Sequence, residues 1–321
     1  MSQPRRRPAV TPSAPPLPPA FPHRPAPGVD HTQVMGSPDP VVRMRALSGI
    51  LLVALGYLVA SQLLLYLGAG ISWLARGRPG DFTDGYQLVV GYHLPEGIAV
   101  VDLALASTIL VVMAVGRWWN GLAPGWLVSV RPGVRWGLLG LCLVIGFVVL
   151  NGIYLLGRRG AAWQFAPPAH AWLWILLVVL TAPIQAAGEE FLFRGYLQQA
   201  VGALSGRSWV AVLVSALVFA AMHGVQNLPL FVDRFGFGLA AGLMVVFTGG
   251  LEASIAVHAA NNVSTFCYAI LAGTVAQTRA IDRSSWGTTG VNVLCYLLTG
   301  VLAVLVTRAL GLRTRTPEAS V

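Results

Sequence analysis

Eight apolar runs, most of them long enough to cross a lipid bilayer, constrain the fold of this chain more than any other feature. A helix needs about 20 apolar residues to span a hydrocarbon core of about 30 Å. The runs lie at approximately residues 47–74, 97–116, 135–157, 171–201, 208–222, 235–248, 251–272 and 289–309. Only 10% of the 321 residues are charged, whereas a water-soluble domain carries about 25%. The sequence predicts an all-α polytopic membrane bundle of about eight transmembrane helices, in which the fifth and sixth runs are short.

The apolar runs divide the chain into two helical regions with a tail at each end. Residues 1–45 hold 12 of the 21 prolines without an apolar run, so we expect a disordered cytoplasmic tail rich in Pro and Arg. Residues 46–160 should form the first transmembrane helices, residues 161–310 a second helical region, and residues 311–321 a short carboxyl-terminal tail. Because the first apolar stretch begins only near Leu47, we expect it to remain in the mature protein.

The arginines indicate an orientation. If the amino terminus is cytoplasmic, 14 of the 21 arginines fall on the cytoplasmic side, which predicts a multi-pass plasma membrane protein with both termini in the cytoplasm. The net charge of +9 is spread over tail and loops. A nucleic-acid surface would gather basic residues on one face beside aromatic side chains, so no nucleic-acid partner is expected.

Three of the expected helices carry polar side chains that a membrane interior disfavours. An ionisable group at the centre of a spanning helix costs roughly 2.5 to 3.5 kcal/mol on insertion scales, so such groups face a cavity or each other. Their apolar surroundings make these residues candidates for one shared site. They form three clusters: Glu189, Glu190 and Arg194; Phe219 and His223; His258 and Asn262.

The first cluster has the parts of a general base. Glu190 and Arg194 are four residues apart with the acid first, the order that favours an ion pair on a helix. Adjacent helical residues point about 100° apart, so Glu189 can face a cavity while Glu190 is held by the arginine. A carboxylate without a counter-ion in a low dielectric suits a general base. The alternative is a structural ion pair beside one acid that reaches toward the membrane surface.

The other two clusters supply imidazole and amide groups. Phe219 and His223 share a helix face, so the ring can orient the imidazole; the alternative is a hydrogen-bonded core histidine. His258 and Asn262 can direct two donors toward one point, which an oxyanion requires. Glu189 and His223 lie about 20 to 24 Å along their helices from the turn at residues 202–207. We therefore expect the site inside the membrane, nearer the cytoplasm.

The sequences of the three clusters resemble the motifs of a known protein family. Residues 189–194 read EEFLFR, residues 219–223 read FAAMH and residues 258–262 read HAANN. They resemble the motifs EExxxR, FxxxH and HxxxN of the CPBP intramembrane proteases, also called Abi proteins or type II CAAX prenyl endopeptidases. The resemblance covers roughly residues 170–272. It identifies the second helical region, residues 161–310, as the protease core, and it implies an all-helical bundle of about eight spans.

The resemblance also implies a chemistry. Glu189 and His223 would activate the attacking water, while His258 and Asn262 would hold the oxyanion of the tetrahedral intermediate. Glu190, Arg194 and Phe219 would support them. The implied substrate is a membrane-anchored peptide or protein in the lipid bilayer, processed as in CAAX proteins, bacteriocins or surface proteins.

The candidate residues are compatible with a metal-dependent and with a metal-free reaction. Glu189, His223 and His258 could supply three ligands to a zinc ion with a fourth place for water, and the same residues also suit a metal-free water activated by glutamate. Two other functions fit acids and histidines in membrane helices. One is a proton-coupled transporter and the other a non-catalytic immunity or scaffold protein with the same fold.

Overall fold

The helices account for most of the chain. The computed structural model describes residues 24–158 and 163–318, and in these ranges the chain contains helices and one isolated β-bridge but no strand. The first half contains η1 (His31–Gln33), α1 (Pro40–Ala75), α2 (Phe82–Val90), α3 (Pro95–Ala106), α4 (Thr108–Ala114), η2 (Val115–Trp119), α5 (Gly125–Val128) and α6 (Trp136–Gly157). The second half contains α7 (Ala171–Glu190), η3 (Phe191–Leu197), α8 (Gln198–Ser205), α9 (Ser208–Ala221), α10 (Leu228–Thr248), α11 (Glu252–Ala272), α12 (Val275–Arg279) and α13 (Trp286–Ala309).

Within the described residues, seven helices are long and apolar enough to cross a membrane, which confirms the predicted polytopic helical bundle. α3, α4 and η2 act as one span, and so do α7, η3 and α8. The spans are Pro40–Ala75, Pro95–Trp119, Trp136–Gly157, Ala171–Ser205, Leu228–Thr248, Glu252–Ala272 and Trp286–Ala309. The predicted fifth run forms α9, which has only 14 residues.

The sixth predicted run begins seven residues earlier than expected. Asn227 caps α10 by accepting a hydrogen bond from the Leu230 amide, and Pro229 occupies the first turn, where a missing N–H costs nothing. Asp233, which precedes the predicted run, is therefore inside the helix. The Asn292 amide donates to its carboxylate at 2.6 Å, which satisfies this acid among apolar side chains.

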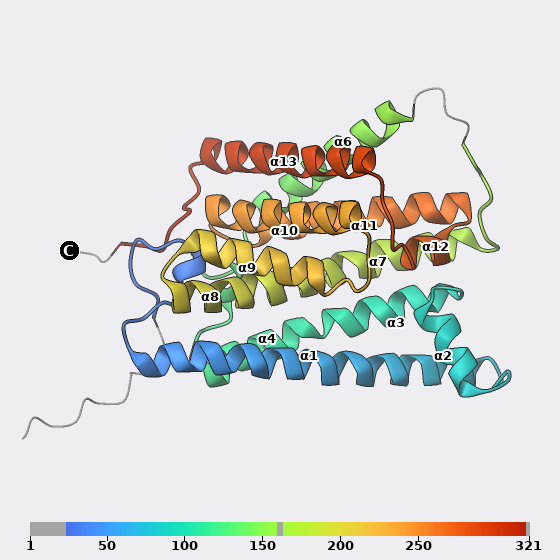
Figure 1. Ribbon diagram of the computed structural model, residues 1–321, viewed down its shortest axis with the longest axis horizontal. Coiled ribbons are helices and arrows are strands. Elements are labelled where there is room, and N and C mark those ends of the chain that lie inside the picture. Colours follow the sequence, from blue (N-terminus) through green and yellow to red (C-terminus); the bar gives the residue numbers. More distant parts are fainter. Residues whose placement is uncertain (1–23, 159–162, 319–321) are drawn as a thin grey trace, which may run out of the picture.

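The helices lie roughly side by side along one direction, with α1, α3 and α4 on one face and α6 and α13 on the opposite face (Figure 1). α11 packs against both α6 and α7, and α10 packs against both α9 and α13. The described ends of the chain lie at the same end of the bundle, near the turn between α8 and α9 (Figure 1). The candidate residues of α7 and α11 are thus carried by neighbouring helices.

Part of the expected tail is packed against the bundle. Residues 1–23 lie outside the described residues, but residues 24–45 contain η1 and the start of α1, so the prediction of disorder is wrong for them. His31 is fully buried, and its Nε2 lies 3.1 Å from the Leu127 carbonyl oxygen and 3.1 Å from Gln199 Nε2. These contacts fix the segment before α1 to the connection between α4 and α6.

Burial of His31 should make the fold sensitive to acid. Burial lowers the pKa of His31 from its ordinary value of 6.5 to about 4, so below pH 6.5 the unfolded chain binds a proton that the folded chain does not. We expect acidification from pH 7 to pH 4 to remove roughly 3 kcal/mol from the free energy of unfolding through this residue. Unfolding at both pH values should show a smaller pH dependence in His31→Gln than in the exposed control His170→Gln. Equal pH dependence in the two variants would contradict this reading.

A buried ion pair fixes the start of α11. Arg135 Nη2 lies 2.6 Å from Glu252 Oε2, and Arg135 Nη1 donates to the Thr248 carbonyl at 2.8 Å. The side chain of Glu252 is fully buried, and Arg135 holds it in place. Gly249 makes the tight turn between α10 and α11 with a φ of 77°, which favours glycine. The turn and the ion pair together set the depth of His258.

Candidate active site

The two glutamates lie where the helix changes its geometry. Glu189 and Glu190 are the last residues of α7, and the next seven residues form the π-helical turn η3. Such turns inside α-helices are frequent at functional sites. Gly188, just before them, allows close packing on α3, because a Cβ there would lie 2.9 Å from the Ala106 Cα. The backbone that carries both acids is therefore held tightly.

Glu190 joins the first and third motifs. Its Oε1 lies 2.9 Å from Arg194 Nη1 and 2.9 Å from His258 Nδ1, and the side chains of Glu190 and Arg194 are fully buried. Because a carboxylate only accepts hydrogen bonds, Nδ1 of His258 must carry a hydrogen in this contact. Glu190 thereby fixes the orientation of the His258 ring, and its second ring nitrogen points to the other acid.

Arg194 is enclosed by aromatic rings. Its guanidinium carbon lies 4.5 Å from the centre of the Phe219 ring and within 5.8 Å of the centres of Phe193 and Phe237. Arg194 Nη2 also donates to the Gly238 carbonyl at 3.2 Å. Cation–π contacts strengthen when the cation is desolvated. The charge of Arg194 is therefore compensated by Glu190 and by the faces of the surrounding rings.

Glu189 occupies a different environment from Glu190. Its side chain is 18% exposed, its Oε2 lies 3.6 Å from His258 Nε2, and its Oε1 accepts a 2.6 Å hydrogen bond from Gln185 Nε2. Gln185 Oε1 in turn accepts from Asn262 Nδ2 at 2.9 Å. A chain of polar contacts thus connects Glu189 to both residues of the third motif.

Gln185 was missed by the sequence reasoning. It lies four residues before Glu189, so the helical spacing that linked Glu190 to Arg194 also predicts this neighbour. The signal was an uncharged amide in an otherwise apolar helix. Its contact with Asn262 on α11 could not be read from spacing along one helix.

His223 lies at the edge of the site. The expected fifth helix included residue 222, but α9 ends at Ala221 and His223 is exposed in the following turn. Its Nδ1 lies 2.7 Å from the Phe219 carbonyl oxygen, so this nitrogen donates and Nε2 is the acceptor in a neutral ring. No hydrogen bond joins His223 to Glu189 in the described chain, although the Glu189 carboxylate acts electrostatically on the imidazole.

Phe219 connects the three motifs more directly than expected. Its ring centre lies 4.6 Å from that of His223 and 6.2 Å from that of His258, and its face covers Arg194. Phe237 packs against both rings, with its centre 5.6 Å from that of Phe219 and 4.8 Å from that of His258. The predicted role of Phe219 beside His223 agrees with these contacts, and Phe237 is an additional ring that the sequence reasoning did not identify.

The candidate metal ligands are not gathered around one point. Within residues 24–158 and 163–318, no group of three or more His, Cys, Asp or Glu side chains could hold a metal ion in the observed arrangement. Of the three candidate ligands, His258 Nε2 lies 3.6 Å from Glu189 Oε2, whereas no hydrogen bond or ion pair joins His223 to either of them in the described residues. The donor set therefore does not fit zinc in this arrangement.

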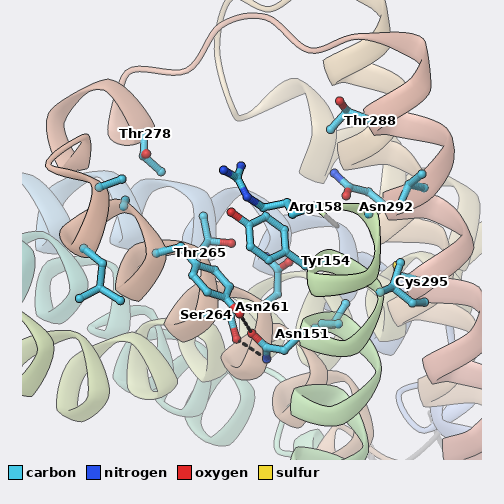
Figure 2. Close-up of a pocket in the computed structure, with 18 of the residues that line it drawn as sticks. Asn151, Tyr154, Arg158, Asn261, Ser264, Thr265, Thr278, Thr288, Asn292 and Cys295 are labelled. Atoms are coloured by element: carbon cyan, nitrogen blue, oxygen red, sulfur yellow. Dashed lines mark hydrogen bonds between the residues drawn. The ribbon is translucent and has the colours of Figure 1, made fainter. Parts of the chain in front are cut away.

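A large cavity with several polar side chains in its lining lies beside the site, between α6, α11, α12 and α13. Its volume is about 840 Å³, and amide, hydroxyl and aromatic side chains line it, among them Asn151, Tyr154, Asn261 and Asn292 (Figure 2). Glu189, His223 and His258 do not line it. Asn261 does, and its Nδ2 donates to Asn262 Oδ1 at 3.2 Å. One hydrogen bond thus connects the lining of the cavity to Asn262 of the candidate site.

Asp102 is not part of these contacts. Its carboxylate accepts hydrogen bonds from the Thr181 hydroxyl at 2.7 Å and from the Tyr92 hydroxyl at 3.3 Å. This buried acid thus links α3 to α7.

Comparisons with known proteins agree with the motif resemblance. The sequence model of the family described as "Type II CAAX prenyl endopeptidase Rce1-like" matches residues 168–264. The "Uncharacterized protein YyaK" of Bacillus subtilis (strain 168) is 32% identical over 101 residues, which are 29% of this chain and 34% of that protein. The chain therefore spans about a third of the length of this curated relative. No solved structure matches.

The matched segment contains all seven candidate residues, from Glu189 to Asn262. It begins just before α7 and ends within α11, so it covers the helices that build the contacts described above. Residues 168–264 of this multi-pass membrane protein thus carry the Rce1-like type II CAAX prenyl endopeptidase pattern, which confirms the family resemblance over that segment.

Proposed function

We propose that this protein is an intramembrane endopeptidase that hydrolyses a peptide bond of a membrane-anchored peptide or protein. The observation that carries the proposal is the contact of His258 with both glutamates, at 2.9 Å to Glu190 and 3.6 Å to Glu189. This contact unites a candidate general base and a candidate oxyanion donor from two separate helices. The match of residues 168–264 to a protease family supports the same reaction.

In the proposed reaction Glu189 is the general base. It takes a proton from a water molecule while the water oxygen attacks the carbonyl carbon of the scissile peptide. Nε2 of His223, the acceptor nitrogen of its neutral ring, helps to orient the water. When the C–N bond breaks, Glu189 returns the proton to the leaving amine. The products are a new carboxylate and a new amine.

Two donors would stabilise the tetrahedral oxyanion. Asn262 Nδ2 carries two hydrogens, one of which is donated to Gln185, so the second is available to the substrate. In its imidazolium form, which carries a hydrogen on each ring nitrogen, His258 supplies the other donor from Nε2 while Nδ1 donates to Glu190. Loss of one oxyanion donor typically costs about 10²- to 10³-fold in rate. Glu190, Arg194 and Gln185 would act by positioning these groups.

We further propose that the cavity beside Asn261 holds part of the substrate chain. Its amide and hydroxyl groups can pair with the backbone of an extended peptide, which needs partners inside a membrane. Thr265 lines the cavity and is exposed, and its side chain forms no hydrogen bond within the described residues. We expect Thr265→Trp to raise KM at least tenfold, while Leu298→Trp on the outer face of α13 leaves KM unchanged. Equal KM values for both variants would exclude the cavity as a substrate site.

A cleavage assay tests the proposal as a whole. The purified protein in vesicles should cut membrane-anchored peptides into two fragments that mass spectrometry detects, and His258→Ala should cut them far more slowly. Equal fragment formation by wild type and His258→Ala would show that the products come from a contaminating protease. In the proposed orientation, with both termini in the cytoplasm of a cell, the site lies nearer the cytoplasmic face of the plasma membrane.

The proposed mechanism makes an expectation about metals. Because no three candidate ligands converge in the described chain, cleavage should proceed unchanged after incubation with a strong zinc chelator. The measurement is the initial rate with and without chelator, together with metal analysis of the purified protein. Loss of activity with the chelator and its recovery with added zinc would contradict the metal-free step.

A further inference from the structure

The outer seam between α10 and α13 contains an apolar groove that the proposed function does not use. Its volume is about 310 Å³, and nearly all of its lining is apolar. Several lining side chains are large and exposed, including Phe247 at 49% and Val301 at 56%. The groove is lined by Leu243, Phe247, Leu297, Val301, Val304 and Leu305, and Arg308 lies at one end.

A second hollow continues from the charged end of this groove. It has a volume of about 430 Å³ and shares Phe247 and Arg308 with the groove. Arg315 also lines it, and the one acid in its lining is Asp30. The Asp30 carboxylate already accepts hydrogen bonds from Thr32 and from Ser208, so it does not neutralise either arginine by contact.

The two arginines remain available to a ligand. Arg308 is exposed, and its side chain forms neither a hydrogen bond nor an ion pair with any residue in the described parts of the chain. Arg315 is also exposed, and its Nη1 donates to the Gly28 carbonyl at 3.1 Å, which leaves its other donors open. Guanidinium groups with open donors favour phosphate, which they can bind through two parallel hydrogen bonds.

The length of the groove matches one leaflet of a bilayer. From Leu297 to Arg308 the groove follows α13 for about 16 Å at 1.5 Å per residue. Half of a hydrocarbon core of about 30 Å is roughly 15 Å. If the groove lies in the apolar part of a leaflet, Arg308 lies at the level of the phosphates.

We propose that these two hollows bind one phospholipid with an anionic headgroup, taken from the surrounding leaflet. One acyl chain lies in the groove between α10 and α13, and the phosphate lies between Arg308 and Arg315. Basic sites at the ends of transmembrane helices bind anionic headgroups in this way. The site is separate from Glu189 and His258, and it does not depend on the proposed peptidase activity.

Native mass spectrometry of the full-length protein tests the proposal. The protein is released from vesicles that contain equal amounts of phosphatidylglycerol and phosphatidylcholine with the same acyl chains. Wild type should retain one phosphatidylglycerol with at least a tenfold preference over phosphatidylcholine. In the double variant R308Q/R315Q this preference should be roughly tenfold weaker. The matched control R313Q changes an exposed arginine of the same segment that lines neither hollow, and it should behave as wild type.

Two further experiments distinguish the contribution of the groove to lipid binding from that of the arginine charges. Val301→Trp fills the groove at an exposed position, and it should lower retention of phosphatidylglycerol although both arginines remain. Glycerol phosphate at the same concentration should not displace the lipid, because it lacks the acyl chain. Displacement by glycerol phosphate, equal retention of both lipids by wild type, or unchanged preference in R308Q/R315Q would each overturn the proposal.

Discussion

Cleavage of a membrane-anchored peptide is expected to slow by about 10²- to 10⁴-fold in Glu189→Gln, the range for removal of a general base. Glutamine keeps an oxygen that can accept the hydrogen bond from Gln185, so the local packing should persist. It cannot take a proton from water at neutral pH. The measurement is kcat/KM for wild type and variant in the same vesicles, with the thermal unfolding midpoint as a check on folding.

The matched control for this prediction is Asp102→Asn. Asp102 is also an acid inside a membrane helix, and its partners Thr181 and Tyr92 belong neither to the candidate site nor to the lining of the cavity. Asp102→Asn should leave kcat/KM within a few-fold of wild type. Equal losses in Asp102→Asn and Glu189→Gln would mean that the loss reflects any change of membrane charge, and the role of Glu189 would be refuted.

Arg194→Met is expected to have the largest effect on stability. It removes the counter-ion of Glu190, whose side chain is fully buried, and breaking one partner of a buried pair typically costs about 3 to 5 kcal/mol. The aromatic rings around Arg194 would also lose their cation–π contacts. The free energy of unfolding in mild detergent should fall by about this amount relative to wild type.

The double variant Glu190→Leu/Arg194→Met separates stability from chemistry. With both charges removed, no buried charge remains unpaired, so most of the lost stability should return. Cleavage should remain slow, because His258 Nδ1 would no longer have the Glu190 carboxylate to hold the ring. A double variant that is as unstable as Arg194→Met, or one that cleaves as fast as wild type, would contradict this assignment.

Contacts along a single helix could be predicted from the sequence. The four-residue spacing from Glu190 to Arg194 predicted the ion pair, and the structure has it at 2.9 Å. The same spacing placed Phe219 beside His223, with ring centres 4.6 Å apart. Such pairs follow from helical geometry alone, which is why they could be assigned before any fold was known.

Contacts between helices could not be predicted in the same way. The link from Glu190 to His258 joins residues 68 positions apart, and the link from Gln185 to Asn262 joins residues 77 positions apart. Both depend on how α7 and α11 pack, which spacing along the chain does not specify. Glu252 shows the same limit, because its partner Arg135 is 117 residues away.

The amino-terminal segment shows how composition can mislead. Proline-rich, weakly apolar sequence predicts an extended tail, and His31 and Thr32 belong to that sequence. Both are nevertheless fully buried, because the bundle supplies hydrogen-bond partners from Leu127 and Ser208. Tertiary contacts from distant residues thus order a segment that has little apolar surface of its own.

One measurement tests the central claim most directly: a single turnover of cleavage in water enriched in oxygen-18. If Glu189 activates water for direct attack on the peptide carbonyl, the new carboxyl terminus should contain one heavy oxygen in the first turnover. A covalent intermediate on Glu189 would place oxygen from the enzyme in part of the first product. Products without the heavy label, or the absence of cleavage by the intact protein in its membrane, would contradict the account.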